Sequence, residues 1–317
     1  MRYIDGDTLD RILDFPSLAE ALDHWHREPP PEVGRSLLTQ DGEGETPDCF
    51  LNLPAWYPGA AMGVKVITVL PANPGKAHGL PAIQALYPVF DGETGEPRAV
   101  IDGTVLTYWK TAGDSALGAR YLARQDPQVL TVVGAGALAP YLARAHCAIR
   151  PSISRVNVWN RTAAKAEAMA EQLADGGVAA SATDDLEAAC READIISCGT
   201  SATSPLVKGA WLKAGCHLDL VGSFTPEMRE TDDDAVRRAG AIFMDYALFA
   251  DEPGDVCIPM QAGLFAQADI LDLYDLAQGR HAGRTGDNEI TFFKNCGGAH
   301  LDLMTALHII EKAEAAP

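Results

Sequence analysis

The segment QVLTVVGAGALAPY, residues 128–141, decides the fold of this chain, because an apolar run ends in glycines and leads into an amphipathic stretch. Gly134 permits a tight turn, and Gly136 lets the backbone come close to a pyrophosphate. Ala139 holds the third position of a GxGxxA motif, and Pro140 suits the first turn of a helix. Since the N–H groups at a helix start attract phosphate, the segment predicts a dinucleotide-binding turn.

Strand-like and helical patterns alternate downstream of this turn. Apolar runs predict strands at 128–134, 153–160, 177–181, 193–200, 216–222 and 241–245. Amphipathic segments predict helices at 138–149, 163–175, 183–193 and 232–239. Strands joined by helical crossovers form parallel sheets that are covered on both faces. The expected fold is therefore α/β, with a doubly wound parallel sheet of the Rossmann type over residues 115–297.

The first 110 residues follow a different pattern. They predict a helix at 17–26, strands at 35–40, 48–53 and 63–70, and a hairpin of 85–91 and 98–102 around a Gly/Pro loop. Further segments predict a helix at 108–125, a strand at 289–295 and an apolar helix at 299–313. We expect the last helix to pack against the N-terminal region. This gives a smaller α+β domain of residues 1–114 with 298–317.

Composition limits the classes of function. The formal net charge is −19, from 44 acidic and 25 basic residues, which argues against nucleic-acid binding because that needs a basic surface. The acidic start MRYIDGDTLD is unlike a signal peptide, and no apolar run reaches the roughly 18 residues that span a membrane. Seven scattered cysteines without a CxxC pair, and histidines without HExxH spacing, predict reduced thiols and no metal site. We expect a cytoplasmic protein.

The end of the second predicted strand concerns the choice of cofactor. In VNVWNRT, residues 156–162, the strand ends on Asn160, Arg161 and Thr162, where NAD-binding folds usually have an acid for the ribose hydroxyl. Asn160 is neutral, Arg161 forms charge-assisted bonds to phosphate, and Thr162 adds a hydroxyl. The sequence therefore predicts NADP(H) over NAD(H). The alternative is that Arg161 is an exposed charge and Asn160 to Thr162 cap a helix.

Motifs along nearly the whole chain carry a family resemblance. They are VKV around Lys65, GLPA at 79–82, the run at 101–123, the glycine turn, VWNRT at 158–162, HLDLVGSFTPEMRE at 217–230 and EITFFKNCGGAHLDL at 289–303. With these motifs the chain resembles the ornithine cyclodeaminase/μ-crystallin family. The resemblance implies a homodimer with its interface in the N-terminal domain. It also implies hydride transfer between nicotinamide and the α-carbon of an amino or imino acid.

The same resemblance implies a set of substrate residues. Arg35 and Lys110 would clamp the substrate carboxylate, and Lys65 would lie nearest the reacting nitrogen. Lys110 stands where the family usually has arginine, so it keeps the charge but loses the bidentate fork. On residue type alone, each of these cations is more simply a solvated charge. Lys65 differs because it interrupts the apolar run AMGVKVITVL, where an unpaired charge is costly.

Two departures from the family pattern concern the substrate. Cyclodeaminases have an acid/base aspartate where this chain has Phe224, and a glutamate for the distal amine where it has Leu51. Phenylalanine transfers no proton but packs on a ring, so we expect a cyclic imino acid rather than ornithine. The alternative for Phe224 is packing at a strand end.

The resemblance also implies further cofactor contacts. These are Ala137 and Leu138 after the glycines, Thr200 after the fourth strand, Val221, Gly222 and Ser223 after the fifth, and Asn295 near the end of the chain. Strand ends are where a doubly wound sheet binds its ligand. Asp219, inside the fifth strand, is expected to be a structural polar residue.

These expectations combine into one leading hypothesis, an NADPH-dependent reduction of Δ1-pyrroline-2-carboxylate or Δ1-piperideine-2-carboxylate. Hydride would reach C2 while Lys65, or a water that it holds, supports protonation of the nitrogen. The alternatives are ornithine cyclodeaminase, alanine dehydrogenase and a protein that binds NADPH and a small ligand without turnover.

Overall fold

The computed structural model describes residues 1–42 and 47–315. The chain divides into two compact units, a first unit of Met1–Lys110 with Gly298–Pro317 and a second unit of Thr111–Gly297. The chain passes between them inside α3 (Gly103–Leu122) and again after β15 (Thr291–Lys294).

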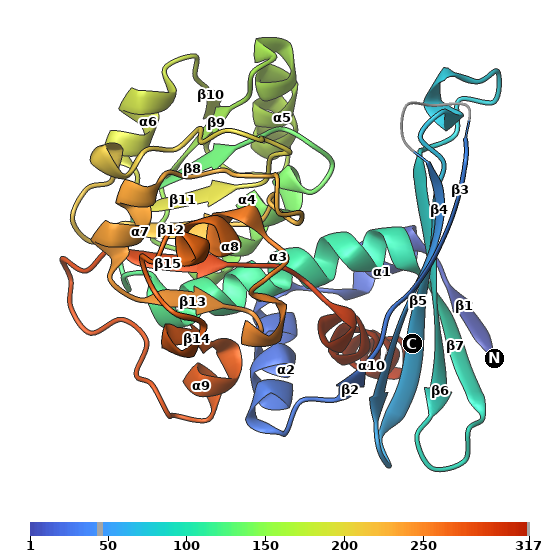
Figure 1. The fold of residues 1–317 in the computed structure, drawn as a ribbon. Helices are drawn as coiled ribbons and strands as arrows, with labels where there is room; N and C mark the ends of the chain where they lie inside the picture. The colour runs from blue at the N-terminus through green and yellow to red at the C-terminus, as the bar shows by residue number, and fades with distance from the viewer. Residues whose placement is uncertain (43–46, 316–317) are drawn as a thin grey trace. The chain divides into compact units, whose positions relative to one another are not determined.

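The second unit contains one parallel sheet (Figure 1). Within residues 111–297, the strands are β8 (Val129–Val133), β9 (Arg155–Trp159), β10 (Ala180–Ala182), β11 (Ile195–Cys198), β12 (His217–Leu220), β13 (Ile242–Met244), β14 (Ile270–Asp272) and β15. Their order is β10-β9-β8-β11-β12-β15-β13-β14. Every predicted strand of this region is confirmed. β14 is an addition to the prediction, and β15 lies between β12 and β13.

Helices cover both faces of this sheet. They are α4 (Ala139–Ile149), α5 (Ala163–Asp175), α6 (Leu186–Glu192), α7 (Asp233–Ala239), α8 (Gly254–Gln261) and α9 (Leu273–Ala277). Successive strand residues point to opposite faces. Leu130 and Val132 therefore join a core with α4 and α5, whereas Val133 joins another with α6 and α7. The doubly wound α/β fold is confirmed.

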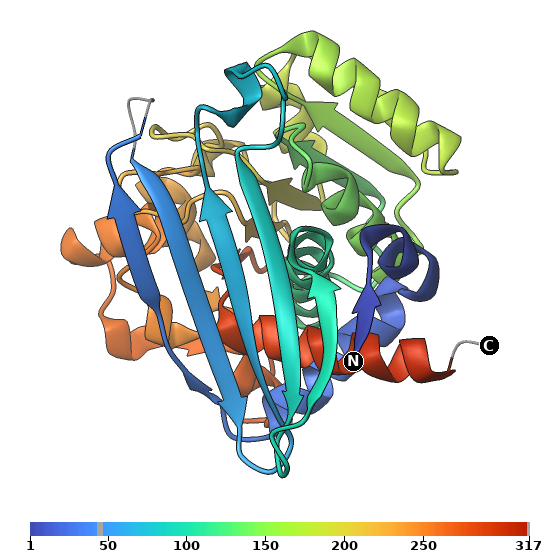
Figure 2. The ribbon, with the colours of Figure 1, turned by 90° about the vertical axis from the view of Figure 1, so that its right-hand side faces the viewer.

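The first unit is built on a largely antiparallel sheet, which Figure 2 shows face on. Its strands are β1 (Arg2–Ile4), β2 (Glu32–Val33), β3 (Ser36–Gln40), β4 (Asp48–Tyr57), β5 (Ala61–Val69), β6 (Ile83–Asp91) and β7 (Pro97–Asp102). The order is β1-β7-β6-β5-β4-β2, with β3 also paired to β4. Only the pairing of β1 with β7 is parallel among the described strands of this sheet. The predicted hairpin is β6 and β7.

Helices α1 (Gly6–Ile12), α2 (Phe15–Arg27) and α10 (Ala299–Ala315) complete the first unit. α10 packs against α2, β4 and β5, as expected for the last helix. Along β5, Ala61, Gly63 and Lys65 are buried while the alternating residues Met62 and Val64 are half-buried. One face of the sheet is thus the core face and the other is more exposed.

Two features refine the predicted elements. α3 begins at Gly103, earlier than the expected residue 108, because the Asp102 carboxylate accepts the N–H groups of Thr104 and Val105 at 2.9 and 3.0 Å and caps the helix. Short 3₁₀ turns occur at Asn73–Gly75, Gly209–Trp211, Ala247–Phe249 and Gln267–Asp269.

Candidate functional site

The glycine turn after β8 has the backbone that the sequence motif requires. Gly134 has φ of +110°, and a Cβ there would lie 2.7 Å from the Gly199 carbonyl oxygen, so a side chain is excluded both by conformation and by space. A Cβ on Gly136 would meet nothing within 4 Å, so its backbone faces open space. α4 starts directly afterwards at Ala139 with a proline in its first turn. The turn can therefore present N–H groups to a phosphate.

A pocket of about 380 Å³ opens beside this turn. Its lining residues are Gly134, Ala135, Gly136, Trp159, Asn160, Arg161, Lys165, Gly199, Thr200, Ser201, Ala202, Thr203, Ser204 and Leu206. Five of these, at 134, 136, 160, 161 and 200, are cofactor residues in the sequence analysis. The hydroxyls of Ser201, Thr203 and Ser204 add hydrogen-bonding groups that the sequence analysis did not select. The cradle, the hydroxyls and the basic residues fit a dinucleotide.

Asn160 connects the glycine turn to the start of α5. Its Oδ1 accepts the N–H of Ala135 at 3.2 Å, and its Nδ2 donates to the carbonyl of Thr162 at 3.0 Å. Thr162 occupies the N-cap position of α5 without a side-chain hydrogen bond to the helix. The amide therefore bonds backbone groups on both sides, which a carboxylate cannot do because it has no donor.

Two cations stand at the mouth of the pocket. Arg161 and Lys165 are both exposed and line it. Lys165 lies in the first turn of α5, where a positive charge opposes the helix dipole. That unfavourable position is a signal from which sequence reasoning could have selected Lys165.

The remaining predicted cofactor residues follow strand ends. Ala137 is exposed and Leu138 is the N-cap of α4. After β12, the Val221 N–H donates to the Cys198 carbonyl at 2.8 Å, and Gly222 and Ser223 follow. Ser223 is fully buried, and its hydroxyl donates to the Met228 carbonyl at 2.7 Å.

Asn295 follows β15 and belongs to a buried polar network. Its Nδ2 donates to the Thr111 carbonyl at 2.8 Å and to Ser115 Oγ at 3.0 Å. Ser115 in turn donates to Asp219 at 2.9 Å, and Asp219 also bonds Ser197 at 2.7 Å and His146 at 3.0 Å. Burial raises the pKa of Asp219, but the bonds from His146 and Ser197 outweigh it, so the pKa is lowered. The buried Asp219 is held from three sides.

The first unit gathers three charged side chains on the core face of its sheet. Lys65 on β5 donates to Asp302 on α10 at 3.0 Å, and Lys110 on α3 lies 3.5 Å from the same carboxylate. All three are buried, with Asp302 completely inaccessible. Two ammonium groups thus share one carboxylate (+2 and −1), which leaves a net positive charge.

Burial lowers the pKa of Lys65 to about 8, with Lys110 adding to the effect and Asp302 opposing it. Lys65 therefore carries its proton at neutral pH but releases it more readily than an ordinary lysine. Burial and the Asp302 charge raise the pKa of Tyr87, another buried residue of this unit, well above its ordinary value. The protonated Lys65 ammonium can therefore bind a carboxylate and supply a proton.

Arg35, Leu51 and Phe224 lie in different settings. Arg35 is exposed in the link between β2 and β3. Leu51 is half-buried on β4, two residues from Leu53, which pairs with Lys65, so Leu51 shares the sheet face of Lys65. Phe224 is 60% exposed after β12.

Asp302 is the residue of this cluster that sequence reasoning did not select. It is an acid inside the apolar helix AHLDLMTALHII, which is the same kind of signal that Lys65 gives within its apolar strand. Partnered burial of a charge is the usual reason for such an interruption.

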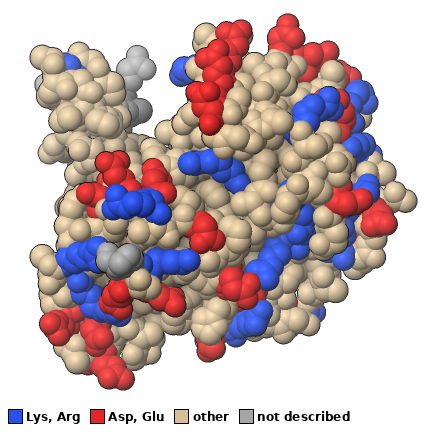
Figure 3. Space-filling model, turned by 180° about the vertical axis from the view of Figure 1, so that it is seen from behind, with Lys and Arg blue, Asp and Glu red and all other residues tan. Residues whose placement is uncertain are grey.

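On the face drawn in Figure 3, basic side chains are interspersed with acidic ones. Within residues 1–42 and 47–315, no three His, Cys, Asp or Glu side chains are grouped to hold a metal ion. None of the helices in the same ranges has both the length and the apolar character to cross a membrane.

Comparison with known families gives a match over almost the entire chain. The model of the ornithine cyclodeaminase/mu-crystallin family matches residues 20–316. The Δ1-pyrroline-2-carboxylate reductase of Paracoccus denitrificans is 39% identical over 306 residues, which cover 96% of this chain and 94% of that protein.

Two solved structures extend the comparison. The Thermococcus litoralis Δ1-pyrroline-2-carboxylate reductase in complex with NADH and L-proline has a TM-score of 0.89 at 28% identity, over 99% of this chain and 98% of that chain. An archaeal alanine dehydrogenase dimer with bound NAD has a TM-score of 0.85 at 26% identity, over 99% and 96%. Nicotinamide cofactors are thus bound by proteins of this fold.

Proposed function

The chain belongs to the ornithine cyclodeaminase/mu-crystallin family, and from this premise we propose that it reduces a cyclic imino acid, Δ1-pyrroline-2-carboxylate or Δ1-piperideine-2-carboxylate, to the cyclic L-amino acid. The C=N bond gains a hydride at C2 and a proton at nitrogen. The similarity to Δ1-pyrroline-2-carboxylate reductases over nearly the whole chain supports this reaction.

The cluster of Lys65, Lys110 and Asp302 is the observation that carries the proposal. Its net positive charge matches the single carboxylate of such a substrate, and its burial strengthens the attraction. Lys110 and the exposed Arg35 hold the carboxylate, and the Asp302 charge offsets the repulsion between the two ammonium groups. Lys65, with a pKa of about 8, is protonated at neutral pH and donates to the imine nitrogen.

The cofactor in this proposal is NADPH, which supplies the hydride when bound. The glycine turn, Ala137, Leu138 and Thr200 hold the pyrophosphate side, and the residues 221–223 with Asn295 complete the site. Arg161 and Lys165 give the mouth of the pocket two positive charges, which suit a 2′-phosphate. NADH is the alternative, since relatives of this fold bind NADH or NAD.

Leu51 and Phe224 support a cyclic substrate. Neither side chain offers a carboxylate to a distal ammonium group, and neither can transfer a proton, as the cyclisation of ornithine requires. Leu51 lies on the sheet face of Lys65, and Phe224 offers an exposed ring. An apolar ring is the substrate that such residues accept.

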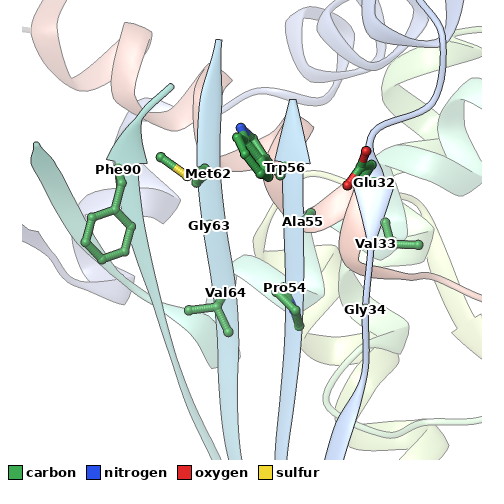
Figure 4. A pocket seen from close by; sticks show the side chains of 10 residues that line it. All are labelled: Glu32, Val33, Gly34, Pro54, Ala55, Trp56, Met62, Gly63, Val64 and Phe90. Atoms are coloured by element: carbon green, nitrogen blue, oxygen red, sulfur yellow. The ribbon is translucent and has the colours of Figure 1, made fainter. Parts of the chain in front are cut away.

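The proposed enzyme is a homodimer joined through the exposed face of the sheet in the first unit. A groove of about 590 Å³ runs over β2, β4, β5 and β6, and Figure 4 shows Trp56, Met62, Val64, Pro54 and Phe90 along it. Large apolar side chains of this face are exposed, including Trp56 at 46%. An apolar patch of this kind is typical of a subunit interface. The related alanine dehydrogenase is a dimer.

We place the enzyme in the cytoplasm. All seven cysteines are free among the described residues, which is typical of a reducing compartment.

Cofactor oxidation tests the reaction. NADPH or NADH is mixed with the five-membered imine, the six-membered imine, pyruvate plus ammonia, or no substrate, and a separate assay follows ammonia release from ornithine. Rapid loss of NADPH with a cyclic imine is the expected result. Turnover confined to pyruvate plus ammonia or to ornithine would replace the proposal, and NADPH binding without any turnover would indicate a ligand-binding protein.

A further inference from the structure

Glu230 is a fully buried carboxylate in the connection between β12 and α7, and its two oxygens bond the backbone after β11 and the backbone directly after β12. Oε1 accepts the Thr200 N–H at 2.7 Å and the Thr200 hydroxyl at 2.8 Å. Oε2 accepts the Gly222 N–H at 2.7 Å. One side chain therefore joins the loop after β11 to the loop after β12.

Both of these loops belong to the wall of the dinucleotide pocket or touch it. Thr200 lines the pocket, and a Cβ on Gly134 would lie 3.2 Å from its Cγ2. A Cβ on Gly222 would lie 1.9 Å from the Thr200 carbonyl oxygen and 2.6 Å from Glu230 Oε1. The loops meet at a point where only glycine fits, so a shift of either one moves the pocket wall.

Glu230 is itself fixed by its backbone. Its N–H donates to Asp255 at 2.8 Å, and its carbonyl accepts the N–H groups of Leu206 and Val207 at 2.9 and 3.0 Å. Its carboxylate therefore has a defined position from which to hold the two loops.

We propose that Glu230 is a positioning residue for the cofactor, because its carboxylate fixes Thr200 and Gly222 and so forms the pocket wall before the dinucleotide binds. The inference rests on the nicotinamide-cofactor part of the proposed function and not on the imine. Three donor groups converge on two oxygens, which an ionised carboxylate satisfies completely. An amide or a protonated acid would direct a hydrogen of its own toward one of those donors.

The charged and titratable groups around Glu230 come from three elements. They are Asp255 on α8, Cys198 on β11 and Lys294 on β15. Burial raises the pKa of Glu230 to about 7, while Lys294 lowers it and Asp255 raises it further. The side chain therefore changes its charge close to neutral pH.

This titration has opposite effects on stability and on cofactor binding. The pKa of Glu230 is higher in the folded protein than the ordinary 4.5, so folding favours the protonated side chain. The contribution of Glu230 to folding stability therefore falls as the pH rises from 4.5 toward about 7. Over the same range the ionised form, which accepts from all three donors, becomes more populated, so cofactor affinity rises. If Glu230 acted on folding stability alone, cofactor affinity would instead fall together with stability as the pH rises.

The test measures NADH dissociation constants by fluorescence titration, because NADH lacks a 2′-phosphate that would itself titrate. The variants are Glu230→Gln and, as a matched control, Asp194→Asn. The Asp194 carboxylate also accepts two backbone N–H groups, of Gln128 at 2.7 Å and Val129 at 3.0 Å, but at the opposite end of β8 and β11. Thermal unfolding of each variant is followed in parallel.

We expect Glu230→Gln to raise the NADH Kd about tenfold at pH 8 and to remove the increase in affinity between pH 6 and pH 8. Asp194→Asn should lower the melting temperature and change the Kd less than about twofold. An unchanged Kd in Glu230→Gln, or equal weakening in both variants, would overturn the inference.

If Glu230→Gln does not fold, Glu230→Asp decides, because its shorter carboxylate cannot hold both Thr200 and Gly222 in the same geometry. A raised NADH Kd in the folded Glu230→Asp variant supports the inference, and an unchanged Kd overturns it. Because binding is measured without imine, a chain that binds NADH in this way but reduces no imine would overturn only the proposed reaction.

Discussion

Lys65 Nζ lies 3.0 Å from Asp302 Oδ1, although 237 positions separate the two residues in the sequence. The pair joins β5 to α10 within the first unit, and Lys110 approaches the same carboxylate at 3.5 Å. The C-terminal helix thus sets the charge balance around a lysine from the first quarter of the chain.

Asp302→Asn should destabilise the protein by about 3–5 kcal/mol, because it leaves two buried ammonium groups without their shared counter-charge. It should also lower the pKa of Lys65 further, since Asp302 raises it. Denaturant unfolding and the pH profile of turnover measure the two effects. Glu311→Gln removes an exposed acid from the same helix and serves as the control. Equal stability of the two variants would contradict the assigned role of Asp302.

The kcat/KM for imine reduction should fall as the pH rises through about 8, because Lys65 then loses the proton that it donates. Stability should change in the opposite direction. The pKa of Lys65 is lower in the folded protein than the ordinary 10.5, so its contribution to stability increases with pH between about 8 and that value. Lys65→Arg keeps its charge at high pH, and its residual activity should lose this alkaline decline. A decline that persists there would assign the titration to another group.

Asn160→Asp should shift the cofactor preference toward NADH. An aspartate keeps an acceptor for the Ala135 N–H but loses the donor to Thr162, and its charge repels a 2′-phosphate. We expect the ratio of kcat/KM for NADPH to that for NADH to fall about tenfold or more. Steady-state kinetics with both cofactors measure the ratio, and an unchanged ratio would argue against a phosphate at this strand end.

The double variant Arg161→Ala with Lys165→Ala should raise the KM for NADPH and leave that for NADH nearly unchanged. The affected attraction is between exposed charges, so added salt should reduce the difference between the variant and the unmutated enzyme. Arg155→Ala is the control, because Arg155 lies at the start of β9 and is paired with Glu192. An equal increase in KM for both cofactors would place the two cations at the pyrophosphate instead.

Trp56→Glu should convert the proposed dimer into a monomer, because it places a charge in the apolar groove. Sedimentation velocity over a range of concentrations measures the change. Leu248→Glu, at an exposed apolar residue of the second unit, should leave the assembly unchanged. A monomeric unmutated chain, or a Trp56→Glu variant that remains dimeric, would refute an interface on this face.

Local pattern predicted most of the fold, because strands and helices are specified by the spacing of apolar residues. The sequence ILD of β14 is too short and too acidic at its end to produce such a pattern. The insertion of β15 between β12 and β13 could not be predicted either, because it is a pairing of segments far apart in the chain.

The site shows the same division between local and distant information. Lys65 is recognisable because it interrupts an apolar strand, but its distance to Asp302 depends on packing. Lys165 could have been selected from its unfavourable place at a helix start. Glu230 could not, because it stands in the stretch ETDDD, where one buried acid resembles its solvated neighbours.

The position of β15 within the sheet has a consequence for synthesis on the ribosome. The strand pairs with β12 on one side and β13 on the other, and the chain then continues directly into α10, which covers the sheet of the first unit. Domains generally fold one after another as the chain emerges. Here neither unit can be completed until residues 291–315 have been made, so a nascent chain that stalls before residue 291 exposes one sheet without β15 and another without its covering helix to chaperones and proteases.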